Sequence, residues 1–152
     1  MANIFIYPTT SFILFDLVNR FGHKPLTVTT QIRDLVTNLS VDSPPLNITQ
    51  EDPKKGLKYA AIEVPAGIRG RMSLIGPLIE ISDAAIIVQN APANFGCSGC
   101  NRTNELSKFL IRSKLEKKYI LEIKYPETEE QAEFFVNSIF NFLNKIKNEM
   151  NK

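Results

Sequence analysis

The chain alternates between segments typical of strands and segments typical of helices, and residues 84–88, Ala-Ala-Ile-Ile-Val, form an uninterrupted apolar run. A strand has this composition when helices cover both faces of its sheet, as they do around a central parallel strand. Strands that alternate with helices favour parallel pairing through crossover helices. We therefore expect an α/β fold in which residues 84–88 form the middle strand of a mostly parallel sheet.

Five segments rich in β-branched, aromatic or other apolar residues predict strands. These segments are residues 3–7, 26–28, 59–64, 84–88 and 119–124. Apolar residues at helical spacing predict helices over about 11–22, 30–39, 104–112 and 128–150. Residues 67–71, Gly-Ile-Arg-Gly-Arg, predict a basic turn that leads into a partly helical stretch. We expect a sheet of Rossmann-like or flavodoxin-like type, with about five strands and helices on both faces.

The clearest helix signal lies near the end of the chain. Thr128 and Gln131 have the spacing of a capping box, in which the two side chains bond backbone N–H groups of the first turn. Glutamates are concentrated near this start, and Lys145 and Lys147 lie near the end, as the helix dipole favours. The expected core face consists of Phe135, Ile139, Phe142, Leu143, Ile146 and Met150.

Length and charge exclude several classes of protein. A chain of 152 residues has the size of a single domain, so we expect the proline-rich stretch at about 40–56 to be a surface loop rather than a linker. A net charge of +2 is too small for binding nucleic acid through its phosphates. No apolar run reaches the ~18 residues of a membrane span, and no basic segment precedes the apolar start. The expected location is therefore the cytoplasm.

The two cysteines of the chain, Cys97 and Cys100, form a C-x-x-C pair between the expected central strand and a helix. In an open α/β sheet, ligands bind in the crevice at the carboxyl ends of such strands. The start of a helix also offers free N–H groups and the positive end of the helix dipole, which favour thiolates. The sequence therefore places the most reactive residue types where a ligand crevice is expected.

Three interpretations of the pair remain open at this stage. A closed zinc site needs four ligands, and this chain offers only two thiols and the remote His23. The pair therefore predicts a metal or iron–sulfur site whose other ligands come from a partner protein or a second copy of the chain. A thiol–disulfide couple is the second interpretation. The third is a pair of structural cysteines that pack in a glycine-rich turn, because free cysteine behaves as a small apolar residue.

Several polar residues near the pair are candidates for contact with a ligand or a partner protein. These candidates are Asn101, Arg102, Asn104 and Glu105. An arginine beside two thiolates favours their ionised form or binds a carboxylate through two hydrogen bonds. One of Asn101 and Thr103 is expected to cap the following helix.

Two further arginines and the histidine have less specific surroundings. Arg69 and Arg71, in the expected basic turn, predict either an anion site at the carboxyl edge of the sheet or a solvated loop. His23 follows Gly22 at the end of a predicted helix, where a histidine usually interacts with helix carbonyls. A catalytic role for His23 is the minority interpretation.

Four sequence blocks carry a resemblance to a known family. The blocks are Ile4-Phe-Ile-Tyr-Pro8, Leu17-Val-x-Arg-Phe-Gly-His23, Phe95-Gly-Cys-x-Gly-Cys-x-Arg-Thr-Asn-Glu-Leu106 and Leu121-Glu-x-Lys-Tyr-Pro126. Together they resemble the methanogenesis marker protein 5 family over nearly the whole chain, and the cysteine block is the most specific of them. That family is confined to methane-metabolising archaea and has no assigned catalytic activity.

The resemblance implies a role in assembling, modifying or activating methyl-coenzyme M reductase, whose nickel cofactor must be reduced to work. It implies partners among other methanogenesis marker proteins and maturation proteins of that reductase. Because electron delivery to a low-potential centre suits an iron–sulfur cluster, Cys97 and Cys100 are expected to contribute thiolates to a cluster shared with a partner. The resulting hypothesis is an accessory subunit rather than a standalone enzyme.

Overall fold

The computed structural model describes residues 1–37, 51–96 and 101–150, and its centre is a parallel sheet. The strands are β1 (Asn3–Tyr7), β2 (Lys24–Leu26), β3 (Ala84–Gln89) and β4 (Ile120–Lys124). Their order across the sheet is β2-β1-β3-β4, and each neighbouring pair is parallel. The expected α/β fold class is therefore confirmed, and the run at 84–88 lies inside the sheet between β1 and β4.

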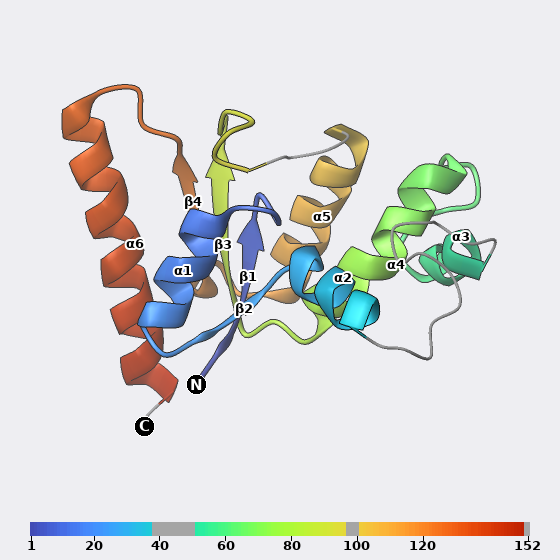
Figure 1. Cartoon of the computed structure of the whole chain (residues 1–152), viewed down its shortest axis with the longest axis horizontal. Helices are drawn as coiled ribbons and strands as arrows, with labels where there is room; N and C mark the ends of the chain where they lie inside the picture. Colours follow the sequence, from blue (N-terminus) through green and yellow to red (C-terminus); the bar gives the residue numbers. More distant parts are fainter. Residues whose placement is uncertain (38–50, 97–100, 151–152) are drawn as a thin grey trace.

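Helices cover both faces of this sheet (Figure 1). On one face lie α1 (Phe12–Arg20) and α6 (Glu129–Met150), and on the other lie α2 (Val28–Thr37), α4 (Ala66–Glu80) and α5 (Asn101–Lys114). Side chains alternate along the strands, because successive residues of a strand point to opposite faces. In β1, Ile4 and Ile6 pack toward α1 and α6, whereas Phe5 and Tyr7 pack toward α4 and α5.

The expected strand at residues 59–64 is wrong. Residues 59–64 form turns that lead into α4, after the short helix α3 (Glu51–Lys55) and the 3-10 helix η1 (Gly56–Lys58). The apolar character of this segment has another cause, because the Tyr59 ring packs on α4 at Gly76, where an added Cβ would lie 2.4 Å from the ring. Short apolar runs do not distinguish a strand from a turn that packs on a helix.

The expected basic turn at residues 67–71 is also wrong, because these residues form the first turns of α4. Pro65 precedes the helix, and its carbonyl accepts hydrogen bonds from the N–H groups of Ile68 and Arg69 at 2.9 and 3.1 Å. The glycines suggested a turn, yet Gly70 is buried within the helix. The partly helical stretch expected after residue 71 is the rest of α4, which continues through Pro77 to Glu80.

Two boundaries differ from the sequence-based expectation. The strand expected at 26–28 is β2, which ends at Leu26, because the Thr27 hydroxyl accepts the Thr30 N–H at 3.1 Å and starts α2. Of the stretch at about 40–56, residues 38–50 lie outside the described residues, and α3 and the start of η1 are helical rather than loop.

The last helix follows the sequence closely. The Thr128 hydroxyl accepts the Gln131 N–H at 3.3 Å, and the Gln131 side-chain oxygen accepts the Glu127 N–H at 2.9 Å. The expected core face is buried, except that Met150 is 46% exposed at the end of the helix. No helix within the described segments is long and apolar enough to span a lipid bilayer.

Candidate ligand crevice at the carboxyl edge of the sheet

The carboxyl ends of the four strands lie at one edge of the sheet, because all neighbouring strands are parallel. β2, the next strand along the chain, pairs with one side of β1. β3 then pairs with the other side of β1, so the order of strands reverses at β1. Open α/β sheets bind ligands at such a reversal of strand order. The segments that follow β1, β2 and β3 therefore define the region in which to look for a site.

The turn after β1 contains Thr9, Thr10 and Ser11, and its conformation is held by short-range hydrogen bonds. The Ser11 N–H donates to the Pro8 carbonyl at 3.2 Å, and the Ser11 hydroxyl accepts the Leu14 N–H at 3.4 Å as the N-cap of α1. This cap satisfies one of the free N–H groups at the start of α1. The turn therefore presents the two threonine side chains at the edge of the sheet.

The loop after β3 is held against this turn. Phe95 is buried, and its ring packs edge-on against Tyr125 at 5.1 Å and Phe135 at 6.1 Å between centroids. An added Cβ on Gly96 would lie 3.0 Å from the Pro8 Cβ and 3.1 Å from the Ser11 nitrogen. Glycine at position 96 therefore permits the close approach of the two loops at this edge.

A cavity of about 210 Å³ lies beside the β1–α1 turn, and we refer to it as the edge cavity. Its wall combines residues from β1, from the β1–α1 turn and from helices α2, α4 and α5. The lining residues are Tyr7, Thr9, Thr10, Val28, Arg71, Leu74, Ile75, Thr103, Asn104 and Ser107.

Three of the polar side chains that line the edge cavity, Thr103, Asn104 and Ser107, come from α5. Thr103 is the third residue of α5 and is only 3% exposed, yet its hydroxyl has no hydrogen-bond partner among the described residues. The nearby Ser107 hydroxyl, in contrast, donates to the Thr103 carbonyl at 2.7 Å. A buried hydroxyl without a hydrogen-bond partner lowers the free energy of unfolding, so native proteins contain few such groups.

A second cavity of about 200 Å³ adjoins the first and shares Thr9 and Thr10 with it. It lies between the β1–α1 turn and the start of α2, and its lining includes Arg33. The start of α2 is already capped within the chain, because the Thr27 hydroxyl accepts the Thr30 N–H and lies 3.0 Å from the Thr30 hydroxyl. The buried hydroxyl without a partner thus belongs to the edge cavity and not to its neighbour.

The structure brings together two of the residues that sequence analysis singled out. Arg71 and Asn104 both line the edge cavity. Arg69 lies elsewhere, where its guanidinium donates to the Val64 carbonyl at 3.0 Å and to the Pro53 carbonyl at 3.4 Å. Residues two positions apart on a helix point about 200° apart, so Arg69 and Arg71 of α4 diverge.

For most of the other predicted site residues, the structure does not describe the side chain. Cys97 and Cys100 lie outside the described residues. Asn101 and Arg102 are the first two residues of α5, and their side chains are not described. Glu105 is exposed and forms an ion pair with Lys108 at 3.1 Å. Partner binding by these residues stays a prediction.

The sequence predicts that Asn101 or Thr103 caps the following helix. Thr103 is the third residue of α5 rather than the residue before the helix, and the side chain of Asn101 is not described. The sequence signal that could have identified Thr103 is its position in the first turn of a helix that starts at the carboxyl edge. At such a position, backbone N–H groups and side chains both face the crevice.

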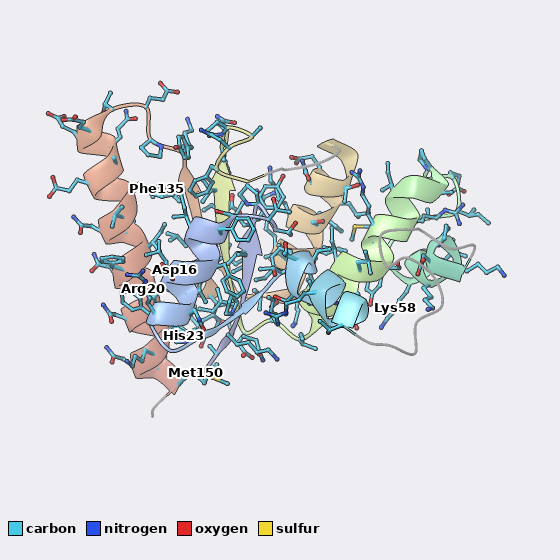
Figure 2. All side chains as sticks on the ribbon, viewed as in Figure 1. Asp16, Arg20, His23, Lys58, Phe135 and Met150 are labelled. Atoms are coloured by element: carbon cyan, nitrogen blue, oxygen red, sulfur yellow. The ribbon has the colours of Figure 1, made fainter. Side chains whose placement is uncertain are left out.

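His23 lies away from this edge, beside the amino ends of the strands (Figure 2). It is 3% exposed, its Nδ1 accepts the Ala2 N–H at 3.3 Å, and its Nε2 donates to the Leu143 carbonyl at 3.1 Å. Since a backbone N–H can only donate and a carbonyl can only accept, these partners define the neutral tautomer with its proton on Nε2. His23 therefore has a structural position, bonded to a carbonyl of α6.

The described segments contain no group of three or more histidine, cysteine, aspartate or glutamate side chains that could hold a metal ion. The Glu122 carboxylate on β4 accepts two hydrogen bonds from Arg112, at 2.7 and 2.9 Å, and one from Gln89 at 3.0 Å. The hydrogen bonds from Arg112 lower the pKa of Glu122 from its usual value. Glu122 is thus the acceptor of a local ion pair.

The fold and the edge cavity define a flavodoxin-like class of α/β protein, with an open parallel sheet and a crevice at its carboxyl edge. Within that class, the chain belongs to a family described as uncharacterized proteins conserved in archaea (DUF2112), whose model matches residues 2–146. It is 60% identical over 147 residues to uncharacterized protein MJ0404 of Methanocaldococcus jannaschii, with 97% of each chain covered. No solved structure matches the chain.

Proposed function

We propose that this protein is an accessory subunit in methanogenesis, which contributes the thiolates of Cys97 and Cys100 to a metal or iron–sulfur site completed by a partner. Its role is the maturation or activation of methyl-coenzyme M reductase. The observation that carries the proposal is the place of the cysteine segment in the chain. It follows Gly96, which packs on the β1–α1 turn, and precedes α5, whose first turn lines the edge cavity.

The ligand count supports a shared site rather than a closed one. The chain has two cysteines and one histidine, and His23 is engaged by backbone groups at the opposite edge of the sheet. Two thiolates are half of the ligand set of a common iron–sulfur cluster. A partner protein or a second copy of this chain would supply the rest.

The relatives support the biological setting. The family is archaeal, and the relative at 60% identity comes from a methanogen. The resemblance to the methanogenesis marker protein 5 family points in the same direction. We propose that the partners are other methanogenesis marker proteins and the maturation proteins of the reductase. A bound cluster would relay electrons from a low-potential electron-donor protein, which is oxidised, to the nickel cofactor, which is reduced.

The experiment is purification of the tagged chain from its native host without oxygen, followed by measurement of iron, acid-labile sulfide and the absorption spectrum. The test variant is C97S/C100S, and the matched control is Ser98→Ala in the same segment. We expect iron and sulfide in the wild type and in the control, loss of both in the cysteine variant, and co-purification of reductase maturation proteins with all three.

Two other results would replace the proposal. A metal-free preparation in which the two thiols titrate as a reversible disulfide would show a thiol–disulfide protein. A metal-free protein whose partners are unchanged in C97S/C100S would show an interaction module with structural cysteines. The folded state of each variant is verified from its far-ultraviolet circular dichroism.

A further inference from the structure

Within the described segments, four helices start at the carboxyl edge of the sheet, and the starts of α1, α2 and α5 differ in how their polar groups are satisfied. Ser11 caps α1 and Thr27 caps α2, each through a hydrogen bond to a backbone N–H of its own helix. At the start of α5, the Thr103 hydroxyl is buried in the wall of the edge cavity without a partner among the described residues. A buried donor that lacks a partner and lines a cavity is placed to bond a ligand.

The lining of the edge cavity combines apolar side chains with several polar ones. Val28, Leu74, Ile75 and the ring of Tyr7 provide apolar surface, whereas Thr103 and the amide of Asn104 provide hydrogen-bonding groups at the start of α5. Ligand sites commonly combine a mostly apolar wall with a few polar groups that fix orientation. The cavity therefore suits a molecule with an apolar body and a polar group at one end.

The charge of the lining indicates the sign of that polar group. Among the described residues that line the edge cavity, Arg71 is the only charged one, and it forms no ion pair with any described residue. The N-terminus of α5, a helix of 14 residues, adds the positive end of a helix dipole. The described lining residues include no carboxylate, so both features favour an anion.

We propose that the edge cavity binds a small organic oxyanion, a molecule with a compact apolar body and a single carboxylate or phosphate group. The apolar body packs against Leu74 and Ile75. The anionic oxygens accept hydrogen bonds from the Thr103 hydroxyl and from the Arg71 guanidinium. A cavity of about 210 Å³ is large enough for one aromatic ring, since benzene enters a dry cavity of about 150 Å³.

The test is isothermal titration calorimetry on the full chain with two probes, benzoate and phenyl phosphate, which distinguish the two kinds of anionic group. Benzyl alcohol is the uncharged control probe, and inorganic phosphate is the control without an apolar body. We expect at least one organic anion to bind, and both control probes to bind at least about ten-fold more weakly.

Three variants locate the site. Arg71→Gln and Thr103→Val are expected to weaken binding of the organic anion about ten-fold or more, because each removes one donor to the anion. Arg33→Gln, which removes an arginine from the adjoining cavity, is the matched control and is expected to bind like the wild type. Loss of binding in Arg33→Gln with retention in Arg71→Gln would assign the ligand to the other cavity and overturn the proposal.

Thr103→Val also separates a ligand contact from a structural one. If the hydroxyl serves only the ligand, the ligand-free variant melts at the wild-type temperature or above it, because an unsatisfied buried hydroxyl has been removed. A lower melting temperature would show that the hydroxyl already has a partner in the chain, which would overturn the proposal. So would failure of both benzoate and phenyl phosphate to bind at roughly 10 mM.

Discussion

At the scale of single residues, the ion pair between Arg112 and Glu122 makes a prediction about pH. Its bidentate geometry joins α5 to β4, with nitrogen–oxygen distances of 2.7 and 2.9 Å. The Arg112 hydrogen bonds lower the pKa of Glu122 in the folded protein. The stabilisation is therefore fully present above the unfolded-state pKa of about 4.3, and it is lost as the pH falls through the lower folded-state value.

Glu122→Gln removes this contribution, and we expect it to reduce the free energy of unfolding by about 1 kcal/mol at neutral pH, because the pair is partly exposed and solvent screens it. The difference from the wild type should vanish in acid, below the folded-state pKa. Urea unfolding at several pH values measures both quantities. Glu133→Gln, at an exposed position of α6, is the control, and a difference that persists unchanged in acid would contradict the assignment.

At the scale of elements, the contact between η1 and α4 depends on a glycine. An added Cβ on Gly56 would lie 1.9 Å from the backbone oxygen of Arg69, so no side chain fits there. The Arg69 guanidinium bonds the carbonyls of Val64 and Pro53, the latter in α3. The start of α4 thus holds α3 and η1 through both its backbone and a side chain.

Gly56→Ala should therefore separate η1 from α4 and lower the free energy of unfolding by roughly 3 kcal/mol, the upper part of the range for overpacking. Gly67→Ala is a matched control on α4, because a Cβ at that position meets nothing within 4 Å. That control should gain about 0.5–1 kcal/mol from higher helix propensity. Equal stability of the two variants, measured by thermal or urea unfolding, would refute the close contact.

The same elements show which parts of the fold the sequence could predict. The apolar run at 84–88 and the heptad-like face of α6 carry strong periodic signals, and both became the expected elements. Residues 59–64 carried an ambiguous signal, because the apolar surface of Tyr59 packs on a helix instead of a sheet. In residues 67–71 the glycine spacing favours a turn, yet these residues are helical and Gly70 is buried within α4.

At the scale of the whole molecule, topology explains why the location of the candidate site was predictable and its composition was not. Parallel strands bring the loops after β1 and β3 to one edge whatever their sequences, so the region could be predicted. Which of Arg69 and Arg71 lines the cavity depends on the rotation of α4 about its own axis. The sequence could not indicate this rotation, because it predicts a turn at residues 67–71. Thr103 matters because of its burial beside a cavity, and burial follows from packing between elements far apart in the sequence.

The edge opposite the crevice is held together by His23. The His23 ring forms hydrogen bonds with the Ala2 N–H before β1 and with the Leu143 carbonyl in α6. Ala2 is 21 residues from His23 in the sequence, and Leu143 is 120 residues from it. These bonds link the backbone beside the first strand to the last helix. The Ala2 N–H is buried and loses its acceptor once the ring is removed, whereas the Leu143 carbonyl lies within α6 and still accepts a hydrogen bond of the helix.

His23→Ala should therefore lower the free energy of unfolding by about 2 kcal/mol, since the buried Ala2 N–H left without a partner costs roughly 1–3 kcal/mol. His23→Asn should lose less, because the asparagine oxygen can accept the Ala2 N–H as Nδ1 does. Urea unfolding measures the loss, and amide hydrogen exchange should show faster opening of α6 in the alanine variant. Equal stability of His23→Ala and the wild type would contradict the bridging role, because it would mean that β1 and α6 stay joined without the ring.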